Sequence, residues 1–450
     1  MNKELTEKFK NKKIVILGFG REGQSTYRYL RQLFPEKLLA IADIDESLPR
    51  IFPNLRKAEW ITGKNYQEKT DKFDIIIKSP GIKLTDQFDG VVTSQADLFL
   101  KTYGDQIIGV TGTKGKSTTA SLIYHIIQQQ TNNTVLVGNI GIPPFDAIEC
   151  VDENTLIVNE ISAHQLESTS SSANTAVFLN LYEEHLDRFA DKSAYYQSKL
   201  KFLKNQRSHQ HAVLNDENQM NGDLDTQLPF PGKKWLFGFE EKSERNAWIV
   251  DKQVIFRNPN GIETYPVSKI KLEGRHNLLN VMAAITACRI NGIDYKNVLH
   301  GLESFNGLEH RLERVGVFRD VTFYNDSIST VPQATIEALK TIKDTDTLIL
   351  GGYDRNLNYQ ILYEFLKQSK VAHVIFTGPA GKRMLSEFSK LKARQSSYFE
   401  ESMENIVSKA FGITEKGKVC LLSPAASSYD QFKNFEERGA SFKKAIKNRE

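Results

Sequence analysis

The sequence is poor in cysteine, with three residues, Cys150, Cys288 and Cys420, that lie far apart. An odd number of widely spaced cysteines is typical of reduced thiols and argues against a disulfide framework or a cysteine-rich metal site. The chain also lacks any apolar run near the roughly 18 residues that a membrane-spanning helix needs, and its first residues do not resemble a signal peptide. We therefore expect a cytoplasmic protein with no membrane partner.

An excess of charge of one sign is also absent. Lysine and arginine number 59, aspartate and glutamate number 55, and the two signs are interspersed along the chain. A net charge of +4 without a basic block does not favour a nucleic-acid partner, although it is compatible with an anionic small substrate. The 450 residues are too many for one hydrophobic core, so about three domains are expected. No internal repeat or low-complexity linker separates them.

The most informative motif is a glycine-punctuated loop between an apolar run over 107–110 and a helical pattern. In such a strand-loop-helix arrangement, backbone N–H groups and the helix N-terminus bind phosphate oxygens. Lys116 would place a positive charge beside the β- and γ-phosphates of a nucleoside triphosphate, and the Ser117 hydroxyl would bind the accompanying Mg²⁺. The match to G-x-x-x-x-G-K-[ST] is incomplete, because Val110 stands at the position of the first glycine. The residues expected around the triphosphate are Gly112, Thr113, Lys114, Gly115, Lys116, Ser117, Thr118 and Thr119.

A second glycine pattern opens the chain, after an expected strand over 13–17. A further apolar run over 38–42 ends on Asp43, about 20 residues past the last glycine, as in the dinucleotide-binding fingerprint. A third strand, over 74–78, stops at a proline-glycine turn, on the carboxyl edge where open α/β sheets bind ligands. The residues alone leave open whether this unit binds a dinucleotide or another phosphate ligand. The residues concerned are Gly18, Phe19, Gly20, Arg21, Glu22, Gly23, Asp43, Ser79, Pro80 and Gly81.

Polar residues follow each expected strand of the central part. If these strands are parallel, their carboxyl ends share one edge of the sheet with Lys116. That edge would hold Glu160, a suitable Mg²⁺ ligand, although a strand-end glutamate is as often a helix cap or a solvent-facing acid. It would also hold His185, although a lone histidine more often has a structural role. Lys199 by itself is typical of a charged residue on the solvent-exposed face of a helix. The strands are expected over 134–137, 155–158 and 176–179.

The rest of the chain continues the α/β pattern. Short antiparallel strands are expected over 235–239, 247–250 and 253–256, followed by a helix over 277–291. A third unit begins around Leu308, and glycine or proline ends each of its strands, which suggests another doubly wound sheet. These strands are expected over 345–350, 372–377 and 418–422.

Taken in order, these motifs resemble the Mur ligase family, ATP-dependent enzymes that add amino acids to the peptide of the bacterial cell-wall precursor. The family has its own version of the phosphate loop, which accounts for the departure at Val110. Within the family, residues 324–327 and 421–439 are similar to those of the branch that adds D-glutamate. The resemblance covers nearly the whole chain and rests on residues 112–117, 160–167, 180–188, 274–277 and 309–311.

The resemblance implies an α/β fold of three domains. A Rossmann-like N-terminal domain over 1–95 would bind a UDP-sugar, a central P-loop ATPase-type domain over 96–307 with a mostly parallel sheet would bind ATP, and a Rossmann-like domain over 308–450 would bind the amino acid. The implied substrates are UDP-N-acetylmuramoyl-L-alanine and D-glutamate, which the enzyme would join through an acyl phosphate at the expense of ATP. Two Mg²⁺ ions would assist the reaction, and the enzyme would be a monomer.

The resemblance also assigns roles to residues. Lys116, Glu160, His185 and Lys199 would carry the chemistry, and Ser117, Glu160, His185 and a carbamylated Lys199 would hold the metal ions. Asn277, Arg311 and Asp326 would join the phosphate loop in binding ATP. Asn139, Ser162 and Gln165 would extend the UDP-substrate site from the first unit to the reacting carboxylate. D-Glutamate would contact Thr330, Arg355, Ser428 and Phe435.

Two departures from the family pattern affect the amino-acid pocket. Ile328 stands where many members have lysine, and Arg355 also replaces a common lysine. An arginine can still bind a carboxylate through two hydrogen bonds, but an isoleucine supplies no charge. Three alternatives stay open from the sequence: another Mur-type or folylpolyglutamate-type amide ligase, a non-catalytic P-loop binding protein, and an NAD-dependent dehydrogenase.

Overall fold

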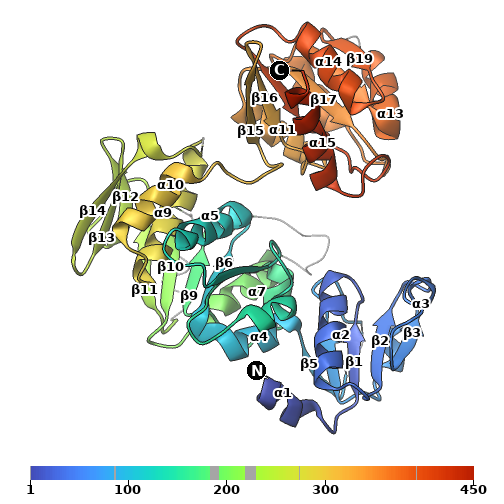
Figure 1. The fold of residues 1–450 in the computed structure, drawn as a ribbon, viewed down its shortest axis with the longest axis vertical. Helices are drawn as coiled ribbons and strands as arrows, with labels where there is room; N and C mark the ends of the chain where they lie inside the picture. Colours follow the sequence, from blue (N-terminus) through green and yellow to red (C-terminus); the bar gives the residue numbers. More distant parts are fainter. Residues whose placement is uncertain are drawn as a thin grey trace. The chain divides into compact units, whose positions relative to one another are not determined.

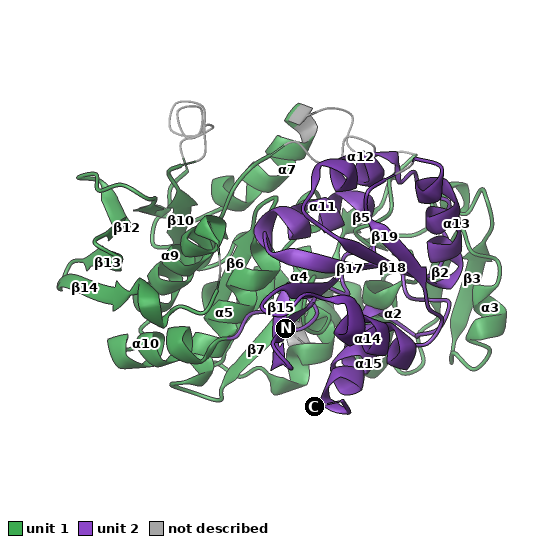
Figure 2. Ribbon diagram, turned by 90° about the horizontal axis from the view of Figure 1, so that it is seen from above, with its two compact units in different colours: residues 1–305 green, residues 306–450 purple. Residues whose placement is uncertain are grey.

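The computed structural model describes residues 2–85, 88–182, 192–217, 230–272, 274–391 and 393–449. The chain divides into two compact units, residues 1–305 and 306–450, which Figure 2 shows in different colours. Three separate β-sheets form along the chain, two in the first unit and one in the second. The mixed α/β class with mostly parallel sheets is thereby confirmed, while the expected limits of three domains at 95 and 307 stay a prediction.

The first sheet has five parallel strands in the order β3-β2-β1-β4-β5 (Figure 1). Strand β1 lies between β2 and β4, so the strand order changes direction beside β1. In open α/β sheets, ligands bind at the carboxyl ends of the strands beside such a point. The strands are β1 (Ile14–Leu17), β2 (Leu39–Asp43), β3 (Ala58–Thr62), β4 (Ile75–Lys78) and β5 (Val91–Thr93). The helices are α1 (Asn2–Phe9), α2 (Arg21–Leu33) and α3 (Leu48–Ile51), with a 3₁₀ turn η1 (Gln67–Lys69).

The second sheet has nine strands in the order β14-β13-β12-β11-β10-β9-β6-β8-β7. Side chains alternate between its faces, so that Val177 joins the core under α5 (Lys116–Gln128) and α9 (Arg275–Ile290). Ala176 and Phe178 join the core under α4 (Gln95–Tyr103) and α7 (Lys192–Lys204). The strands are β6 (Ile107–Thr111), β7 (Thr134–Gly138), β8 (Leu156–Glu160), β9 (Thr175–Phe178), β10 (His211–Asn215), β11 (Lys233–Phe237), β12 (Arg245–Val250), β13 (Gln253–Asn258) and β14 (Gly261–Pro266). The helices are α4 (Gln95–Tyr103), α5 (Lys116–Gln128), α6 (Ala163–Leu166), α7 (Lys192–Lys204), α9 (Arg275–Ile290) and α10 (Tyr295–Ser304), with 3₁₀ turns η2 (Gly104–Gln106), η3 (Pro144–Cys150) and η4 (Val267–Lys269).

One expectation for this sheet is wrong. The strand over 235–239 was expected to be antiparallel to its neighbours, but β11 runs parallel to both β10 and β12. The short connection between Phe237 and Arg245 is typical of an antiparallel hairpin. The direction of β11, however, is set by the neighbouring strand with which it forms hydrogen bonds. Here that strand is β10, which the sequence pattern did not reveal. The antiparallel pairing expected between 247–250 and 253–256 is confirmed by β12 and β13.

The second unit contains one six-stranded sheet in the order β15-β16-β20-β17-β18-β19, in which only β15 runs antiparallel. Apolar side chains form one core on each face of this sheet. The strands are β15 (Glu313–Phe318), β16 (Val321–Asn325), β17 (Thr345–Gly351), β18 (His373–Thr377), β19 (Ser396–Phe399) and β20 (Val419–Leu422). The helices are α11 (Pro332–Thr341), α12 (Gln360–Gln368), α13 (Gly378–Ser389), α14 (Met403–Ile413) and α15 (Phe435–Lys447).

Two observations bear on the environment of the chain. All three cysteines are free thiols, Cys150 exposed and Cys288 and Cys420 buried. Of the helices that the structure describes, none has the length and apolarity that crossing a bilayer requires.

Candidate active site

The phosphate loop connects β6 to α5 at the carboxyl edge of the central sheet. Gly115 occupies the N-cap of α5 with φ +84°, a left-handed conformation that favours glycine. A Cβ atom there would come within 2.4 Å of Asn280 Oδ1 on α9. Glycine is therefore required at this position both by the backbone conformation and by the close approach of α9. No side chain caps the start of α5, which leaves its N–H groups to bind an anion.

Asn180, two residues after the end of β9, holds the phosphate loop through three hydrogen bonds. Its side-chain oxygen accepts from the Lys114 amide (2.7 Å) and its side-chain nitrogen donates to the Lys114 carbonyl (2.9 Å). The Thr113 amide donates to the Asn180 carbonyl (3.0 Å). No role for Asn180 was expected from the sequence, although its place after a strand, on the same edge as Glu160, is the signal that could have indicated one.

Two lysine ammonium groups meet at one carbonyl of the loop. Lys116 Nζ donates to the carbonyls of Gly112 (3.0 Å) and Thr113 (2.9 Å), and Lys199 Nζ donates to that of Gly112 (2.7 Å). Lys199 is 1% exposed and its Nζ lies 5.1 Å from the centre of the Tyr195 ring. The reading of Lys199 as a charge on a solvated helix face is wrong, because α7 turns this residue toward the phosphate loop.

Thr113 links this group of residues to α7. Its hydroxyl oxygen accepts from the Tyr182 amide (3.0 Å) and shares a hydrogen bond of 3.1 Å with the Tyr195 hydroxyl. Tyr195 is a second residue that the sequence analysis missed, and no local pattern marks it. The loop is thus held from β9 on one side and from α7 on the other.

Glu160 ends β8, and strand register pairs it with Val110 of β6. The side chain is fully buried, and Oε1 accepts a hydrogen bond from Asn139 Nδ2 (2.8 Å). The other oxygen, Oε2, is buried and has no hydrogen-bond partner among the described residues. Buried carboxylate oxygens are normally paired, so an unpaired one beside a phosphate loop fits a Mg²⁺ ligand. Ser117, in the first turn of α5, would supply a second oxygen.

The proposed second metal site is only partly visible. His185 lies outside the described residues, so its position relative to Lys199 is not described. Within the part of the chain that the structure covers, no group of three or more histidine, cysteine, aspartate or glutamate side chains is arranged to hold a metal ion. Mg²⁺ bound by one carboxylate, a hydroxyl and nucleotide phosphates requires no such cluster.

The structure brings Asn277 near the phosphate loop. Asn280 Nδ2 donates to Asn277 Oδ1 (2.9 Å), and Asn280 Oδ1 is the atom that a side chain at Gly115 would strike. Asn277 therefore lies one side chain away from the start of α5. Thr118 and Thr119 follow Ser117 in the first turn of that helix, where Thr119 is fully buried.

The three loops expected to bind the UDP-substrate meet at the carboxyl edge of the first sheet. Ser79 Oγ donates to the Gly18 carbonyl (2.9 Å), and Asp43 Oδ2 accepts from the Phe19 amide (2.7 Å). A Cβ atom on Gly23 would lie 2.0 Å from the Gly18 carbonyl oxygen, so the turn closes too tightly for a side chain. Gly20, by contrast, faces open space.

The first and central sheets are joined beside this edge. Gln165 Nε2 donates to Glu22 Oε1 (2.6 Å), while Gln165 also completes a capping box with Ser162. Arg21 donates to the Gly141 carbonyl, next to the loop that carries Asn139. Burial raises the pKa of Glu22 above its ordinary value. These contacts tie the glycine turn before α2 to the segments that carry Asn139, Ser162 and Gln165.

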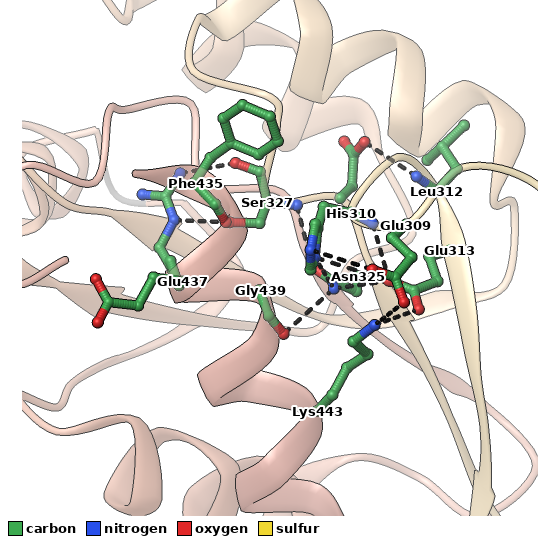
Figure 3. Close-up of polar contacts among 12 residues, drawn as sticks. Glu309, His310, Leu312, Glu313, Asn325, Ser327, Phe435, Glu437, Gly439 and Lys443 are labelled. Carbon is green, nitrogen blue, oxygen red and sulfur yellow. Dashed lines mark hydrogen bonds and ion pairs between the residues drawn. The ribbon is translucent and has the colours of Figure 1, made fainter. Parts of the chain in front are cut away.

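In the second unit, Asp326 is buried and anchors the loop that contains Arg311. Its carboxylate accepts hydrogen bonds from the Leu312 amide (3.2 Å) and from Ser423 Oγ (2.7 Å). Burial raises the pKa of Asp326 to about 6. Figure 3 shows His310 and Asn325 beside this loop, where Asn325 Nδ2 lies 2.9 Å from His310 Nδ1.

The four residues expected to bind D-glutamate differ in exposure. Ser428 is buried, Thr330 and Phe435 are half-buried, and Arg355 is exposed. Among the described residues, no hydrogen bond joins their side chains to one another. They lie on four separate segments of the second unit, and hydrogen bonds from other residues connect these segments.

These features define a class of protein: an ATP-dependent enzyme with a P-loop on a mostly parallel sheet, preceded and followed along the chain by a further α/β sheet. The model of the Mur ligase middle domain matches residues 110–288, and that of the Mur ligase glutamate ligase domain matches residues 310–426. A relative from Clostridium tetani, UDP-N-acetylmuramoylalanine--D-glutamate ligase, is 30% identical over the full length of both chains. The protein of the same name from Acetivibrio thermocellus is 32% identical over 99% of each chain. The chain therefore belongs to the Mur ligase family, the ADP-forming amide ligases of peptidoglycan precursor synthesis.

Solved structures support the same fold. UDP-N-acetylmuramate-alanine ligase from Thermotoga maritima superposes with a TM-score of 0.58 at 17% identity, over 98% of this chain and 100% of that one. UDP-N-acetylmuramoyl-L-alanyl-D-glutamate--2,6-diaminopimelate ligase gives a TM-score of 0.57 at 17% identity, over 85% of this chain and 90% of that one. Membership of this family excludes the dehydrogenase and the non-catalytic P-loop protein that the sequence left open.

Proposed function

We propose that this protein joins D-glutamate to the terminal carboxylate of UDP-N-acetylmuramoyl-L-alanine, with conversion of ATP to ADP and phosphate. The observation that carries the proposal is the grouping of Lys116, Lys199 and the buried Glu160 around the phosphate loop. The choice of D-glutamate is supported by the relatives of that name and by the match of residues 324–327 and 421–439 to that branch. The UDP-sugar is supported by the loops gathered at the first sheet.

The reaction proceeds in two steps. The substrate carboxylate attacks the γ-phosphate of ATP, which forms an acyl phosphate and ADP, and the amine of D-glutamate then attacks the acyl carbon and displaces phosphate. Lys116 and the amides of the loop stabilise the charge that develops on the transferred phosphoryl group. Asn139, Ser162 and Gln165 hold the carboxylate in line with that group.

Glu160 and Ser117 would hold one Mg²⁺ ion, and the proposal retains a second ion at His185 and a carbamylated Lys199. Bound Mg²⁺ neutralises phosphate charge and orients the phosphates for attack. Carbamylation would convert the Lys199 ammonium group into an anionic oxygen ligand. Its burial beside Gly112 puts it in a position from which such a ligand faces the loop.

We also propose the domain limits and the individual site residues that the sequence predicts. Three domains over 1–95, 96–307 and 308–450 would bind the UDP-substrate, ATP and the amino acid respectively. Asn277, Arg311 and Asp326 would complete the ATP site, and Thr330, Arg355, Ser428 and Phe435 the D-glutamate site. We place the enzyme in the cytoplasm as a monomer, and its three free thiols agree with a reducing compartment.

The test is phosphate release from ATP, Mg²⁺ and UDP-N-acetylmuramoyl-L-alanine, with D-glutamate, L-glutamate, L-lysine or glycine added in separate reactions. We expect turnover with D-glutamate alone and none for Lys116→Ala. Lys390→Ala is the matched control, because this exposed lysine follows the last residue of α13 and is none of the proposed site residues. Turnover that prefers another amino acid would assign the chain to a different Mur-type or folylpolyglutamate-type ligase activity.

A further inference from the structure

Arg438 is a buried arginine whose charge is met by carbonyl groups. It lies in the first half of α15, is 3% exposed, and forms no ion pair with any carboxylate of the described residues. Its Nε donates to Ser327 Oγ (2.9 Å) and its Nη2 to the Ser327 carbonyl (2.8 Å). Its Nη1 donates to the carbonyls of Ala426 (3.0 Å), Ser427 (3.2 Å) and Gly351 (3.4 Å).

These acceptors belong to three segments far apart in the sequence. Ser327 lies in the loop after β16, Gly351 ends β17, and Ala426 and Ser427 follow β20. The Ser327 hydroxyl in turn donates to the Phe435 carbonyl (2.9 Å) at the start of α15, and Figure 3 shows these two residues side by side. One guanidinium group therefore connects four segments of the second unit.

Each of these segments carries one residue of the proposed D-glutamate site. Thr330 follows Ser327, Arg355 follows Gly351, Ser428 follows Ser427, and Phe435 lies one turn before the arginine on the same helix. Within the described residues, the side chains of these four site residues form no hydrogen bonds with one another, so the distances between them depend on the backbone segments that carry them. The Arg438 guanidinium group donates hydrogen bonds to the backbone of the three other segments and thereby connects them to α15.

The chemistry of arginine suits this role. Its planar group presents five N–H donors in a fixed geometry, and hydrogen bonds from a charged donor are stronger than neutral ones. Burial lowers the pKa of Arg438 to about 10, so the group stays protonated at neutral pH. Asp430 supplies a longer-range attraction that partly offsets the burial. A lysine at this position would retain the charge but could not reach acceptors in three directions.

We propose that Arg438 is a positioning residue that holds the acceptor amino-acid pocket in shape. This inference rests on the proposed function, because it concerns the site of that reaction's second substrate. It assigns no role to Arg438 in binding ATP or the UDP-substrate. Its loss should therefore weaken binding of D-glutamate selectively.

The experiment measures initial rates of Arg438→Lys while each of the three substrates is varied in turn. We expect the KM for D-glutamate to rise about tenfold or more, and the KM values for ATP and the UDP-substrate to change less than about twofold. Arg394→Lys is the matched control, because this exposed arginine precedes the edge strand β19 and donates to the Ser369 carbonyl after α12, not to any of the four connected segments. An unchanged KM for D-glutamate, or an equal rise in all three, overturns the inference.

A second variant covers the case in which Arg438→Lys does not fold. Ser327→Ala removes only the hydroxyl that links Nε to the Phe435 carbonyl, and a thermal melt establishes that the variant is folded. Its KM for D-glutamate should rise by about threefold to tenfold, again without a matching change for ATP. No rise in this folded variant overturns the inference. Wild-type protein without D-glutamate-dependent turnover overturns the proposed function, and the inference with it.

Discussion

Replacement of Asn180 by alanine tests whether the phosphate loop depends on the segment after β9. The change removes two reciprocal hydrogen bonds, at 2.7 and 2.9 Å, between the Asn180 side chain and the backbone of Lys114. Such bonds contribute about 0.5–1.5 kcal/mol each, so the loop loses about 1–3 kcal/mol of its restraint. If this restraint preorganises the loop for ATP, the KM for ATP rises by roughly 5-fold to 150-fold.

The assay is phosphate release as a function of ATP concentration, with calorimetric titration of a non-hydrolysable ATP analogue as a direct measure of binding. Asn174→Ala is the matched control, because Asn174 flanks the other end of β9 and its side chain donates a hydrogen bond to Asn291 Oδ1 (3.3 Å), not to the phosphate loop. Asn180→Asp keeps the acceptor for the Lys114 amide but adds a negative charge beside the phosphates. It should therefore bind ATP more weakly than Asn180→Ala.

Two results would refute this reasoning. An ATP affinity of Asn180→Ala equal to that of wild type would show that the loop is rigid without Asn180. Equal losses in Asn180→Ala and Asn174→Ala would show that the effect comes from general destabilisation of β9.

Three further predictions follow from single side chains. Glu160→Gln should lower turnover by about 100-fold or more and raise the Mg²⁺ concentration needed for half-maximal activity, measured by Mg²⁺ titration, because an amide is a weaker ligand than a carboxylate. Asp326 has a folded pKa of about 6, above its ordinary value of 3.8. The folded state therefore binds more protons between these pH values, and denaturant titrations should show wild-type stability falling, relative to Asp326→Asn, as pH rises from about 4 to about 6. Gly439→Ala should lower the melting temperature, because its Cβ atom would lie 2.2 Å from His310 Nδ1, whereas Gly412→Ala on α14 meets no atom within 4 Å and should be neutral or slightly stabilising.

Local patterns were enough to predict several of the strands that are buried on both faces, but not β10 and β16, which are also buried. The apolar runs over 74–78, 345–350 and 418–422 became β4, β17 and β20 within one residue at each end. Exposed or edge strands such as β15 and β19 were missed, because half-exposed strands lack a continuous apolar run. The direction of β11 was wrong for a related reason, since it depends on a partner that is distant in sequence.

The site residues also fall into two groups, those that a local sequence pattern predicts and those that depend on partners distant in sequence. Gly112 to Ser117 and Gly18 to Gly23 are recognisable from the sequence because a turn around a phosphate needs glycines at fixed spacing. Lys199 shows the opposite case: only the packing of α7 reveals that its ammonium group reaches the Gly112 carbonyl. Asn180, Tyr195 and Arg438 likewise act through contacts with residues that no fixed spacing connects to them.

The sequence by itself determined the α/β class, the two phosphate-type turns and the order of the family's motifs, because each of these depends on residues that are neighbours in the chain. The tertiary structure decided which strands pair, that Glu160 keeps an unpaired buried oxygen, and that one guanidinium group joins four segments of the second unit. These features depend on burial and on hydrogen bonds between distant segments, and both exist only after the chain has folded.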